Sequence, residues 1–399
     1  MYGGNYGPPQ GSYGPPQGYA PPQGYAPPQG YAPPRGYAPP QGYAPPPQGY
    51  ARGPPTQYAI SGHPTGPPQY QGPVSTNPQG GMMNGNMRFE YSSMQGKRKA
   101  LLIGVNYVGT NSQLRGCWND VHNMANFIKR HAGYKDEDMV LLLDEGNGHP
   151  RSMPTRANIC SVLTRETAAM QWLVSGAQPG DALFFHYSGH GGQAPATEGD
   201  EEDGMNETIL PVDYNRAGQI EDDELHARLV RPLPIGCRLT ALFDSCHSGT
   251  ALDLPYVYST SGTIKEQNLT MNVGKGILGA GMDYLRGDIG GMVQDIWGTV
   301  KGASTGSRAA EITRATRSSG ADVISFSGCK DSQTSADASE AGTATGAMSW
   351  AFITVLNQYP QLSYLQFLNA CRDLLAAKYS QKPQLSASHP IDVNLLFVM

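Results

Sequence analysis

Two polar motifs, each following an apolar run, contain the residues best suited to covalent chemistry. The first, HYSGHGG, covers residues 186–192, and the second, DSCHSG, covers residues 244–249. A cysteine attacks acyl carbons well when a base removes its proton and N–H donors stabilise the oxyanion. Cys246 is therefore the candidate nucleophile and His190 the candidate base, with the N–H groups of Gly191 and Cys246 as oxyanion donors.

The simpler explanations of each residue weaken when the two motifs are considered together. A lone cysteine after an apolar strand is usually a buried core thiol, and a histidine in a glycine-rich loop is usually structural. Here both residues stand beside glycine-containing turns at the ends of apolar runs, which favours a cysteine–histidine dyad. His247 is the poorer base, because adjacent side chains at a strand end point in opposite directions.

Three other kinds of site are not indicated. A phosphatase loop requires arginine six positions after the cysteine, where this chain has Leu252. A serine-hydrolase elbow requires G-x-S-x-G, whereas the residues around Ser188 read HYSGH. The six cysteines include no C-x-x-C pair, which argues against a zinc ribbon and a disulfide scaffold.

Short apolar runs that alternate with helical patterns position these motifs. The runs predict buried strands at 97–107, 139–145, 180–192, 237–249, 322–328 and 391–399. The helical patterns cover 113–133, 155–174, 346–358 and 363–378. This alternation predicts an α/β fold with a mostly parallel central sheet and helices on both faces. Such folds bind and react beyond the carboxyl ends of their strands, where both motifs lie.

The first 92 residues differ in composition from the rest and predict a disordered pro-segment. They repeat GYAPPQ units, and before Glu90 the only charged residues are Arg35, Arg52 and Arg88. Such a segment has too little apolar surface to offset the entropy of ordering.

The net charge of -5 argues against nucleic-acid binding through a basic patch. No stretch approaches the roughly 18 apolar residues of a membrane span, and MYGGNYGPPQ lacks the features of a secretory signal. A cytoplasmic location is expected, with a nuclear one also open.

The paired motifs HYSGHGG and DSCHSG resemble those of the metacaspases, in the caspase-like clan of cysteine peptidases. The resemblance extends over about residues 97–399, and the repetitive leader is similar to that of type I fungal members. It implies a caspase-like α/β/α sandwich, with His190 as general base and Cys246 as nucleophile. It also implies a large part at 97–253, a linker at 254–320 and a small part at 321–399, in a monomer.

Acidic residues beside the dyad indicate the substrate. Asp244 lies two residues before Cys246, and Asp120 lies in RGCWND. Buried carboxylates are costly unless paired, so acids in a pocket suit a substrate that brings a cation. The resemblance implies that Asp120, Ser188 and Asp244 form a pocket for arginine or lysine, with Cys117 nearby. From the residues alone, Asp120 is also compatible with a helix surface and Cys117 with core packing.

The carboxylate-rich segment 199–225 raises the question of calcium, which prefers several oxygen ligands. Its spacing is not that of an EF-hand, and by itself it is compatible with a solvated acidic surface. The resemblance implies an activating calcium site at Asp222, Asp223 and Asp253, with Asn206 where the family has a fourth aspartate. Asparagine carries no formal charge, so weaker calcium binding is expected unless Asp203 or Glu207 substitutes.

Basic residues in the expected linker are candidates for self-cleavage by an enzyme specific for arginine or lysine. They follow a Ser/Thr/Ala/Gly-rich pattern typical of exposed loops, and are Lys301, Arg308, Arg314 and Arg317. The chain is thus expected to be a calcium-stimulated, self-processing endopeptidase acting on proteins in cell death, stress or protein quality control. The alternative is a non-catalytic scaffold that the leader repeats recruit to aggregated proteins. An aspartate-specific peptidase is disfavoured by the acidic pocket.

Overall fold

The computed structural model describes the part of the chain that carries the expected domain. The described residues are 78–83, 87–146, 149–160, 168–195, 205–245, 251–264, 313–314, 316–329, 338–340, 343–379 and 381–399. They all belong to the second of two units, residues 62–399. Several predictions therefore lie outside the described residues: those on Cys246, Asp203, Lys301, Arg308, most of the leader and most of the linker.

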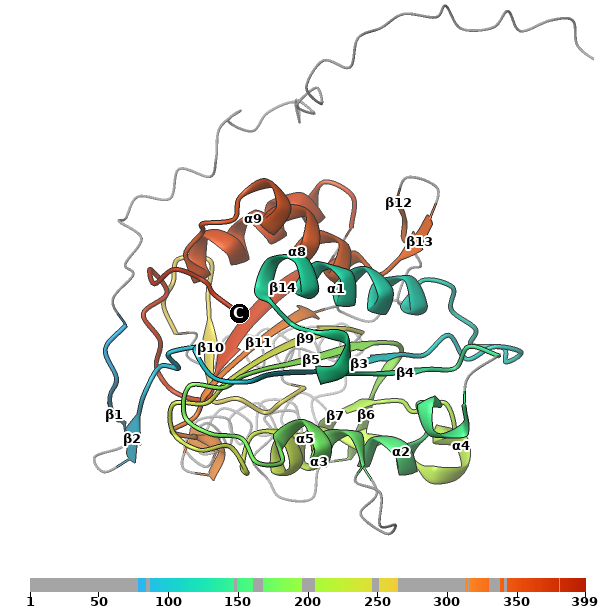
Figure 1. Cartoon of the computed structure of the whole chain (residues 1–399). Coiled ribbons are helices and arrows are strands. Elements are labelled where there is room, and N and C mark those ends of the chain that lie inside the picture. The colour runs from blue at the N-terminus through green and yellow to red at the C-terminus, as the bar shows by residue number, and fades with distance from the viewer. Residues whose placement is uncertain are drawn as a thin grey trace, which may run out of the picture. The chain divides into compact units, whose positions relative to one another are not determined.

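A seven-stranded, mostly parallel sheet forms the centre of the fold, which confirms the predicted α/β class (Figure 1). Its order is β10-β14-β11-β9-β5-β3-β4. The strands from β11 to β4 are parallel to one another, and only β14 runs against its neighbours. In chain order the strands are β3 (Arg98–Gly104), β4 (Met139–Leu143), β5 (Ala182–Ser188), β9 (Arg238–Asp244), β10 (Tyr256–Tyr258), β11 (Asp322–Cys329) and β14 (Lys382–Ala387).

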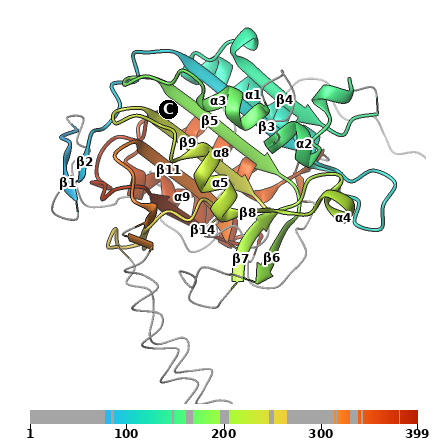
Figure 2. The same cartoon turned by 90° about the horizontal axis from the view of Figure 1, so that it is seen from below.

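Helices cover both faces of this sheet, as the predicted sandwich requires. One face carries α1 (Cys117–Ala132), α8 (Ala347–Gln358) and α9 (Tyr364–Ala376). The opposite face, nearest the viewer in Figure 2, carries α2 (Arg156–Cys160), α3 (Ala169–Val174) and α5 (Asp222–Leu229). Alternate residues of β3 enter two separate cores, with Leu102 in one and Ile103 in the other, because successive strand side chains point to opposite faces. The expected linker contributes β10, which pairs with β14.

Smaller elements lie outside the central sheet. An antiparallel group of β6 (Gly191–Pro195), β7 (Met205–Ile209) and β8 (Ile220–Glu221) follows β5, with α4 (Tyr214–Ala217) in between. The other short elements are β1 (Gly81–Met83), β2 (Met87–Phe89), β12 (Ala338–Glu340), β13 (Thr343–Thr345) and the 3-10 turns Asp136–Asp138 and Pro150–Ser152. Within the described ranges, no helix is long and apolar enough to cross a membrane.

The two ends of the domain differ from the sequence predictions. Strands β1 and β2 form a hairpin, and Phe89 is buried with its ring stacked on that of His389. This part of the segment predicted to be disordered is therefore ordered. The strand predicted at 391–399 is wrong, because β14 is the last strand and this segment contains only isolated bridge residues, such as Leu396 opposite Ser363. The alternating apolar residues there pack into the helical core beside α9 instead of pairing in a sheet.

Candidate active site

The carboxyl ends of β5 and β9, where the two motifs begin, lie side by side at the same edge of the sheet. These strands are parallel neighbours, and Ser188 is the register partner of Asp244. His190 follows Ser188 by two positions, and Cys246 follows Asp244 by two positions in the sequence. The candidate base and the candidate nucleophile therefore each follow, by two positions, one of two residues that are paired on adjacent strands.

The imidazole of His190 has a defined orientation. Its Nε2 lies 2.7 Å from the carbonyl oxygen of Ser112, in the loop between β3 and α1. A carbonyl oxygen only accepts hydrogen bonds, so Nε2 is the donor here, and in the neutral imidazole Nδ1 is the nitrogen with the free lone pair. Nδ1 is therefore the atom that can act as base. The orienting group is a backbone carbonyl, which has no signature in residue type and so could not be predicted from the sequence.

Two buried tyrosines hold the main chain of His190 on either side. The His190 N–H donates to the Tyr107 hydroxyl at 3.0 Å, and the Tyr187 hydroxyl donates to the His190 carbonyl at 2.7 Å. The Tyr107 ring also lies against the imidazole, with centroids 4.7 Å apart. Gly189 makes this approach possible, since a Cβ there would lie 2.6 Å from the Tyr187 hydroxyl oxygen. Neither tyrosine was singled out from the sequence, where both look like core residues.

Removing the Tyr107 hydroxyl should slow catalysis more than it unfolds the protein. The Tyr107 hydroxyl accepts from the His190 N–H and donates to the Leu210 carbonyl at 2.7 Å. Tyr107→Phe removes both hydrogen bonds. We expect kcat/KM to fall about tenfold, corresponding to a hydrogen bond worth about 1–2 kcal/mol. The control is Tyr134→Phe, which removes a buried hydroxyl that donates to the Ala182 carbonyl. The rate of Cys246 alkylation as a function of pH distinguishes a displaced His190 from a loss of protein stability. If Tyr107→Phe leaves this pH profile unchanged, Tyr107 does not position His190.

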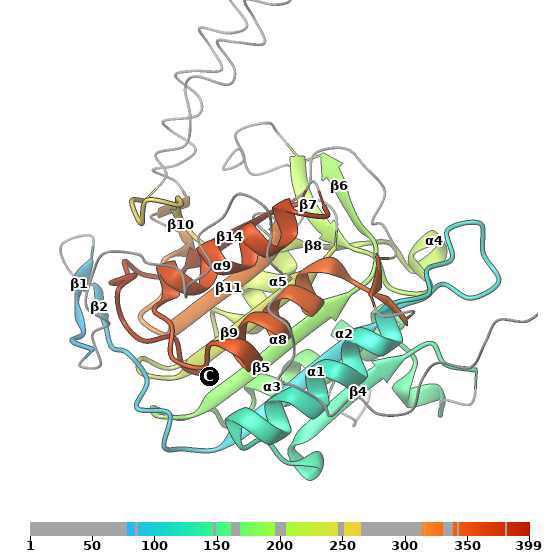
Figure 3. The ribbon, with the colours of Figure 1, turned by 90° about the horizontal axis from the view of Figure 1, so that it is seen from above.

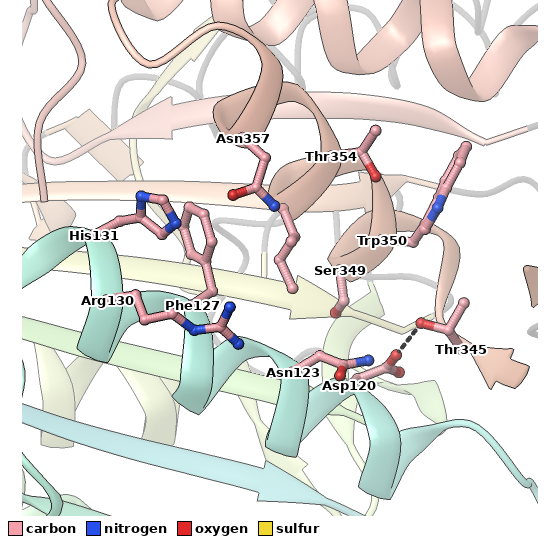
Figure 4. A pocket seen from close by; sticks show the side chains of 11 residues that line it. Asp120, Asn123, Phe127, Arg130, His131, Thr345, Ser349, Trp350, Thr354 and Asn357 are labelled. Carbon is pink, nitrogen blue, oxygen red and sulfur yellow. Dashed lines mark hydrogen bonds between the residues drawn. The ribbon is translucent and has the colours of Figure 1, made fainter. Parts of the chain in front are cut away.

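Asp120 is buried at the start of α1, inside a complete set of donors. Its side chain accepts from Ser188 Oγ at 2.7 Å. It also accepts from Thr345 Oγ1 at 2.5 Å, the bond drawn in Figure 4. The Gly346 N–H donates to the same carboxylate at 2.8 Å. Asp120 and Ser188, both assigned to the pocket from the sequence, are thus in direct contact. Thr345 and Gly346 were missed, because their distance along the chain gives no local signal.

Asp244 is the second buried carboxylate of this region. Its Oδ2 accepts from the Ser349 N–H at 2.6 Å, at the start of α8. The Ser349 hydroxyl in turn lies 2.9 Å from Nε2 of the buried His186. Burial lowers the pKa of His186 to about 3, so this histidine is neutral and structural. The first motif therefore contains one histidine that supports the pocket and one that is suited to catalysis.

The carboxylates of Asp120 and Asp244 converge on Gly346. A Cβ at this position would lie 2.3 Å from Asp244 Oδ2 and 2.7 Å from Asp120 Oδ2, so only glycine fits. Burial, and then the negative charge of Asp244, raise the pKa of Asp120 to about 7. Burial also raises the pKa of Asp244. Within the described ranges, no lysine or arginine forms an ion pair with either carboxylate, so the pair is electrostatically suited to an added cation.

A pocket of about 350 Å³ lies between α1 and α8, which run side by side on the upper face (Figures 3 and 4). Asp120 and Thr345 stand at one end of its lining, and Arg130 and His131 at the other. Cys117 is not among its lining residues. That thiol is buried in the core of the opposite face, and the Cys117 N–H donates to Asn106 Oδ1 at 3.0 Å. The structure therefore gives Cys117 a packing role near the start of α1.

The residues that the resemblance assigns to calcium lie around the start of α5. Asp222 accepts the Glu207 N–H at 2.8 Å, and burial raises the pKa of Asp222 to about 7. Asn206 Nδ2 donates to Asp223 Oδ2 at 3.3 Å and to Glu221 Oε2 at 3.1 Å. The fourth residue, Asp253, is buried in a left-handed conformation with φ 48°. Hydrogen bonds and one shared partner connect all four residues, since the Asp223 N–H also donates to Asp222 Oδ1 at 2.9 Å.

That shared partner is Arg317, whose guanidinium pairs with both Asp223 and Asp253. Carboxylate and amide oxygens are the ligand types that calcium prefers, so the chemistry of the set fits the ion. The geometry is not preformed: in the described parts of the chain, no three His, Cys, Asp or Glu side chains are arranged to hold a metal. Arg317 is buried, so the exposed setting predicted for it as a self-cleavage site is wrong. Arg314 is partly buried.

Comparisons with known proteins point to one family. The family described as "Metacaspase, peptidase C14 domain" matches residues 98–255. Metacaspase-1 of Mycosarcoma maydis is 68% identical over 335 residues, covering 84% of this chain and 81% of that protein. Metacaspase-1 of Cryptococcus neoformans var. neoformans is 58% identical over 342 residues, covering 85% and 73%. Metacaspase-1 of Yarrowia lipolytica is 59% identical over 325 residues, covering 81% and 69%.

A solved structure, protein GSU0716 from Geobacter sulfurreducens, gives a TM-score of 0.44 at 23% sequence identity. The match covers 76% of this chain and 98% of that chain. This likeness is too low to support any statement on function.

Proposed function

Because the chain belongs to the metacaspases, a family of caspase-like cysteine peptidases, we propose that it is a calcium-stimulated endopeptidase specific for arginine and lysine. Membership in the family already makes it a cysteine-type peptidase. The proposal concerns the bond that is cleaved, the activating ion and processing of the chain by itself. The observation that carries the specificity is the pair of buried carboxylates, Asp120 and Asp244, at the ends of α1 and β9.

The reaction is the hydrolysis of a peptide bond in two stages. His190 Nδ1 takes the proton of the Cys246 thiol, and the thiolate attacks the carbonyl carbon. The N–H groups of Gly191 and Cys246 stabilise the oxyanion. The C–N bond then breaks, the leaving amine takes the proton from His190, and a thioester remains. Water, deprotonated by His190, cleaves the thioester to a carboxylic acid and restores the thiol.

Specificity for arginine or lysine follows from charge. Removing two carboxylates from water costs several kcal/mol each unless a cation compensates them. A guanidinium offers five N–H donors in a planar fork, which suits two converging carboxylates. Asp120 already accepts from Ser188, Thr345 and Gly346, so a substrate cation would meet an oriented acceptor. An aspartate side chain would instead add a third negative charge.

Calcium would be held by the oxygens of Asp222, Asp223, Asp253 and Asn206. Bound there, it would neutralise the buried charge of the cluster. Asn206 would have to turn its carbonyl oxygen towards the ion, because its Nδ2 faces carboxylates in this structure. Self-processing belongs to the same proposal: cleavage after Arg317 requires this buried residue to leave its ion pairs, whereas Lys301 and Arg308 lie outside the described residues.

The cellular part of the proposal rests on the sequence. We propose a monomeric enzyme in the cytoplasm or nucleus, acting in regulated cell death, stress response or protein quality control. Its partners would be proteins with arginine or lysine at the cleavage site, and aggregated proteins bound through the leader repeats. The net charge of -5 disfavours nucleic acid as a partner.

Hydrolysis of fluorogenic peptides tests this function. The purified chain should cleave an arginine-terminated peptide in the presence of calcium, far more slowly with a chelator, and an aspartate-terminated peptide hardly at all. Cys246→Ala should abolish cleavage, because the variant lacks the thiol that attacks the carbonyl carbon. Cleavage that persists in this variant would contradict the assigned nucleophile. If a correctly folded wild-type chain cleaves no peptide, a non-catalytic scaffold becomes the better explanation.

A further inference from the structure

Arg317 is a buried cation that binds the expected calcium ligands from within the chain. Only 3% of its surface is exposed. Its Nη2 pairs with Asp223 Oδ1 and its Nε pairs with Asp253 Oδ2. Its carbonyl oxygen accepts a hydrogen bond of 3.0 Å from Nε2 of His226, a buried residue of α5. Both the side chain and the main chain of Arg317 are thus fixed against the acidic cluster.

The other groups of the cluster are arranged around a positive charge that is already present. The Asn206 amide donates to Asp223 Oδ2, opposite the oxygen that Arg317 contacts. Asp253 is held in a left-handed backbone conformation, which aspartate adopts with little penalty and which most other side chains avoid. The guanidinium therefore pairs with two of the carboxylates that a calcium ion would need, Asp223 and Asp253, and the amide adds a hydrogen bond to Asp223.

We propose that Arg317 is a built-in counter-ion that calcium must displace in order to bind. The inference rests on the calcium site of the proposed function and adds that Arg317 competes with calcium for this site. Arg317 pairs with Asp223 Oδ1 and Asp253 Oδ2, so a calcium ion held by these two carboxylates would compete with the guanidinium for their oxygens. Calcium prefers six to eight oxygen ligands, whereas a guanidinium carries only N–H donors. The guanidinium would therefore have to leave the carboxylates before they could coordinate the ion.

Displacement of Arg317 would release the ends of the expected linker. Asp253 stands immediately before this segment and Arg317 stands three residues before its end, so their ion pair joins its two ends. The residues after Arg317 lead through Ser319, whose N–H donates to the Ser388 carbonyl at 3.1 Å, into β11. Calcium binding and loosening of the linker would then be one event.

The first test is a calcium titration by isothermal calorimetry on the full chain carrying Cys246→Ala, which prevents self-cleavage. Arg317→Gln should tighten calcium binding by about 5–150-fold, the usual range for coupled ligands. The matched control is Arg228→Gln, which removes a positive charge from α5 that pairs with Glu224. Its calcium affinity should stay within about threefold of the parent. Equal or weaker binding by Arg317→Gln would overturn the inference.

The second test needs no substitution at Arg317. Hydrogen exchange of the Cys246→Ala chain should become faster in residues 316–319 when calcium is added, because the ion pairs and the contact with His226 are lost. Slower or unchanged exchange there would overturn displacement even if calcium binds. If calcium binds to none of the variants, the calcium part of the proposed function fails as well. If calcium binds and stimulates but Arg317→Gln behaves like the control, only this inference fails.

Discussion

Replacing Asp120 by asparagine is expected to lower kcat/KM for an arginine-terminated peptide by at least about 100-fold, because a buried charge pair with the substrate is lost. Asparagine preserves the shape of the side chain but carries no charge to meet the guanidinium. A peptide with citrulline in place of arginine separates charge from shape, since the two differ little in size. The variant should lose the preference for arginine over citrulline that the wild-type chain shows.

A matched control for this variant is Asp136→Asn, which removes the same charge from an exposed side chain after α1 that pairs with Lys129. The control should keep both kcat/KM and the preference for arginine. An Asp120→Asn enzyme that still prefers arginine would show that other groups recognise the cation. The same result would remove the main support for the proposed specificity.

The raised pKa of Asp120 adds a pH dependence with a definite sign. Burial raises this pKa from 3.8 to about 7, and a cation binds only the ionised carboxylate. The KM for an arginine peptide should therefore rise as the pH falls below about 7, and binding should release protons. The KM for the citrulline peptide should stay nearly constant. Calorimetry in two buffers of different ionisation enthalpy measures the released protons, and equal heats would contradict the assignment.

The same shift acts on stability in the opposite direction. The pKa of Asp120 is higher in the folded chain than in the unfolded chain, so protonation of this group stabilises the fold. This contribution is complete below about pH 3.8 and is lost as the pH rises through about 7. Asp120→Asn should therefore be the more stable chain in mildly alkaline solution and gain little in acid. Urea unfolding at both pH values checks this sign without any substrate.

Breaking the buried ion pair between Arg238 and Asp322 should give the largest loss of stability. Both side chains are only 2% exposed, and Nη1 of Arg238 lies 2.7 Å from Asp322 Oδ2. The same guanidinium contacts the Tyr364 hydroxyl and donates to the Val398 carbonyl at 3.1 Å. Asp322→Ala leaves this charge buried without its carboxylate, and we expect the free energy of unfolding to fall by about 3–5 kcal/mol.

A double variant distinguishes the loss of a partner from the value of the pair itself. Arg238→Met combined with Asp322→Leu removes both charges and should recover much of the stability, because an apolar pair needs no compensation. Lys129→Ala, which breaks an exposed pair with Asp136, should change unfolding by less than about 1 kcal/mol. If Asp322→Ala also costs less than about 1 kcal/mol, the buried pair contributes far less than its geometry indicates.

This ion pair also connects the two parts that the expected linker separates. Arg238 belongs to β9 in the large part, whereas Asp322 and Tyr364 belong to β11 and α9 in the small part. The β9 and β11 strands pair along six register positions, from Asp322 opposite Arg238 to Ser327 opposite Phe243. A cut anywhere in the linker would therefore leave both parts in one sheet.

Local patterns in the sequence were enough to predict the fold class and to choose the residues of the candidate site. Continuous apolar runs of the length of a strand, separated by amphipathic stretches, can be buried only as parallel strands under helices. The two glycine-containing motifs then had to follow the strand ends. The helix predicted over 113–133 is found at Cys117–Ala132 and ends at Gly133, whose φ of 70° suits glycine.

Contacts between residues far apart in the chain decided the rest. Ser112 orients His190 through a backbone carbonyl, and Thr345 and Gly346 complete the surroundings of Asp120 from 225 and 226 positions away. Arg317 lies in a pattern typical of exposed loops, yet it is buried and pairs with two aspartates that are distant in the chain. The residues at 391–399 alternate like a strand because their alternate side chains, Ile391, Val393, Leu395 and Phe397, are buried in the core that α8 and α9 share. Residue type and spacing record which groups can bond, whereas only packing decides which distant partner each one meets.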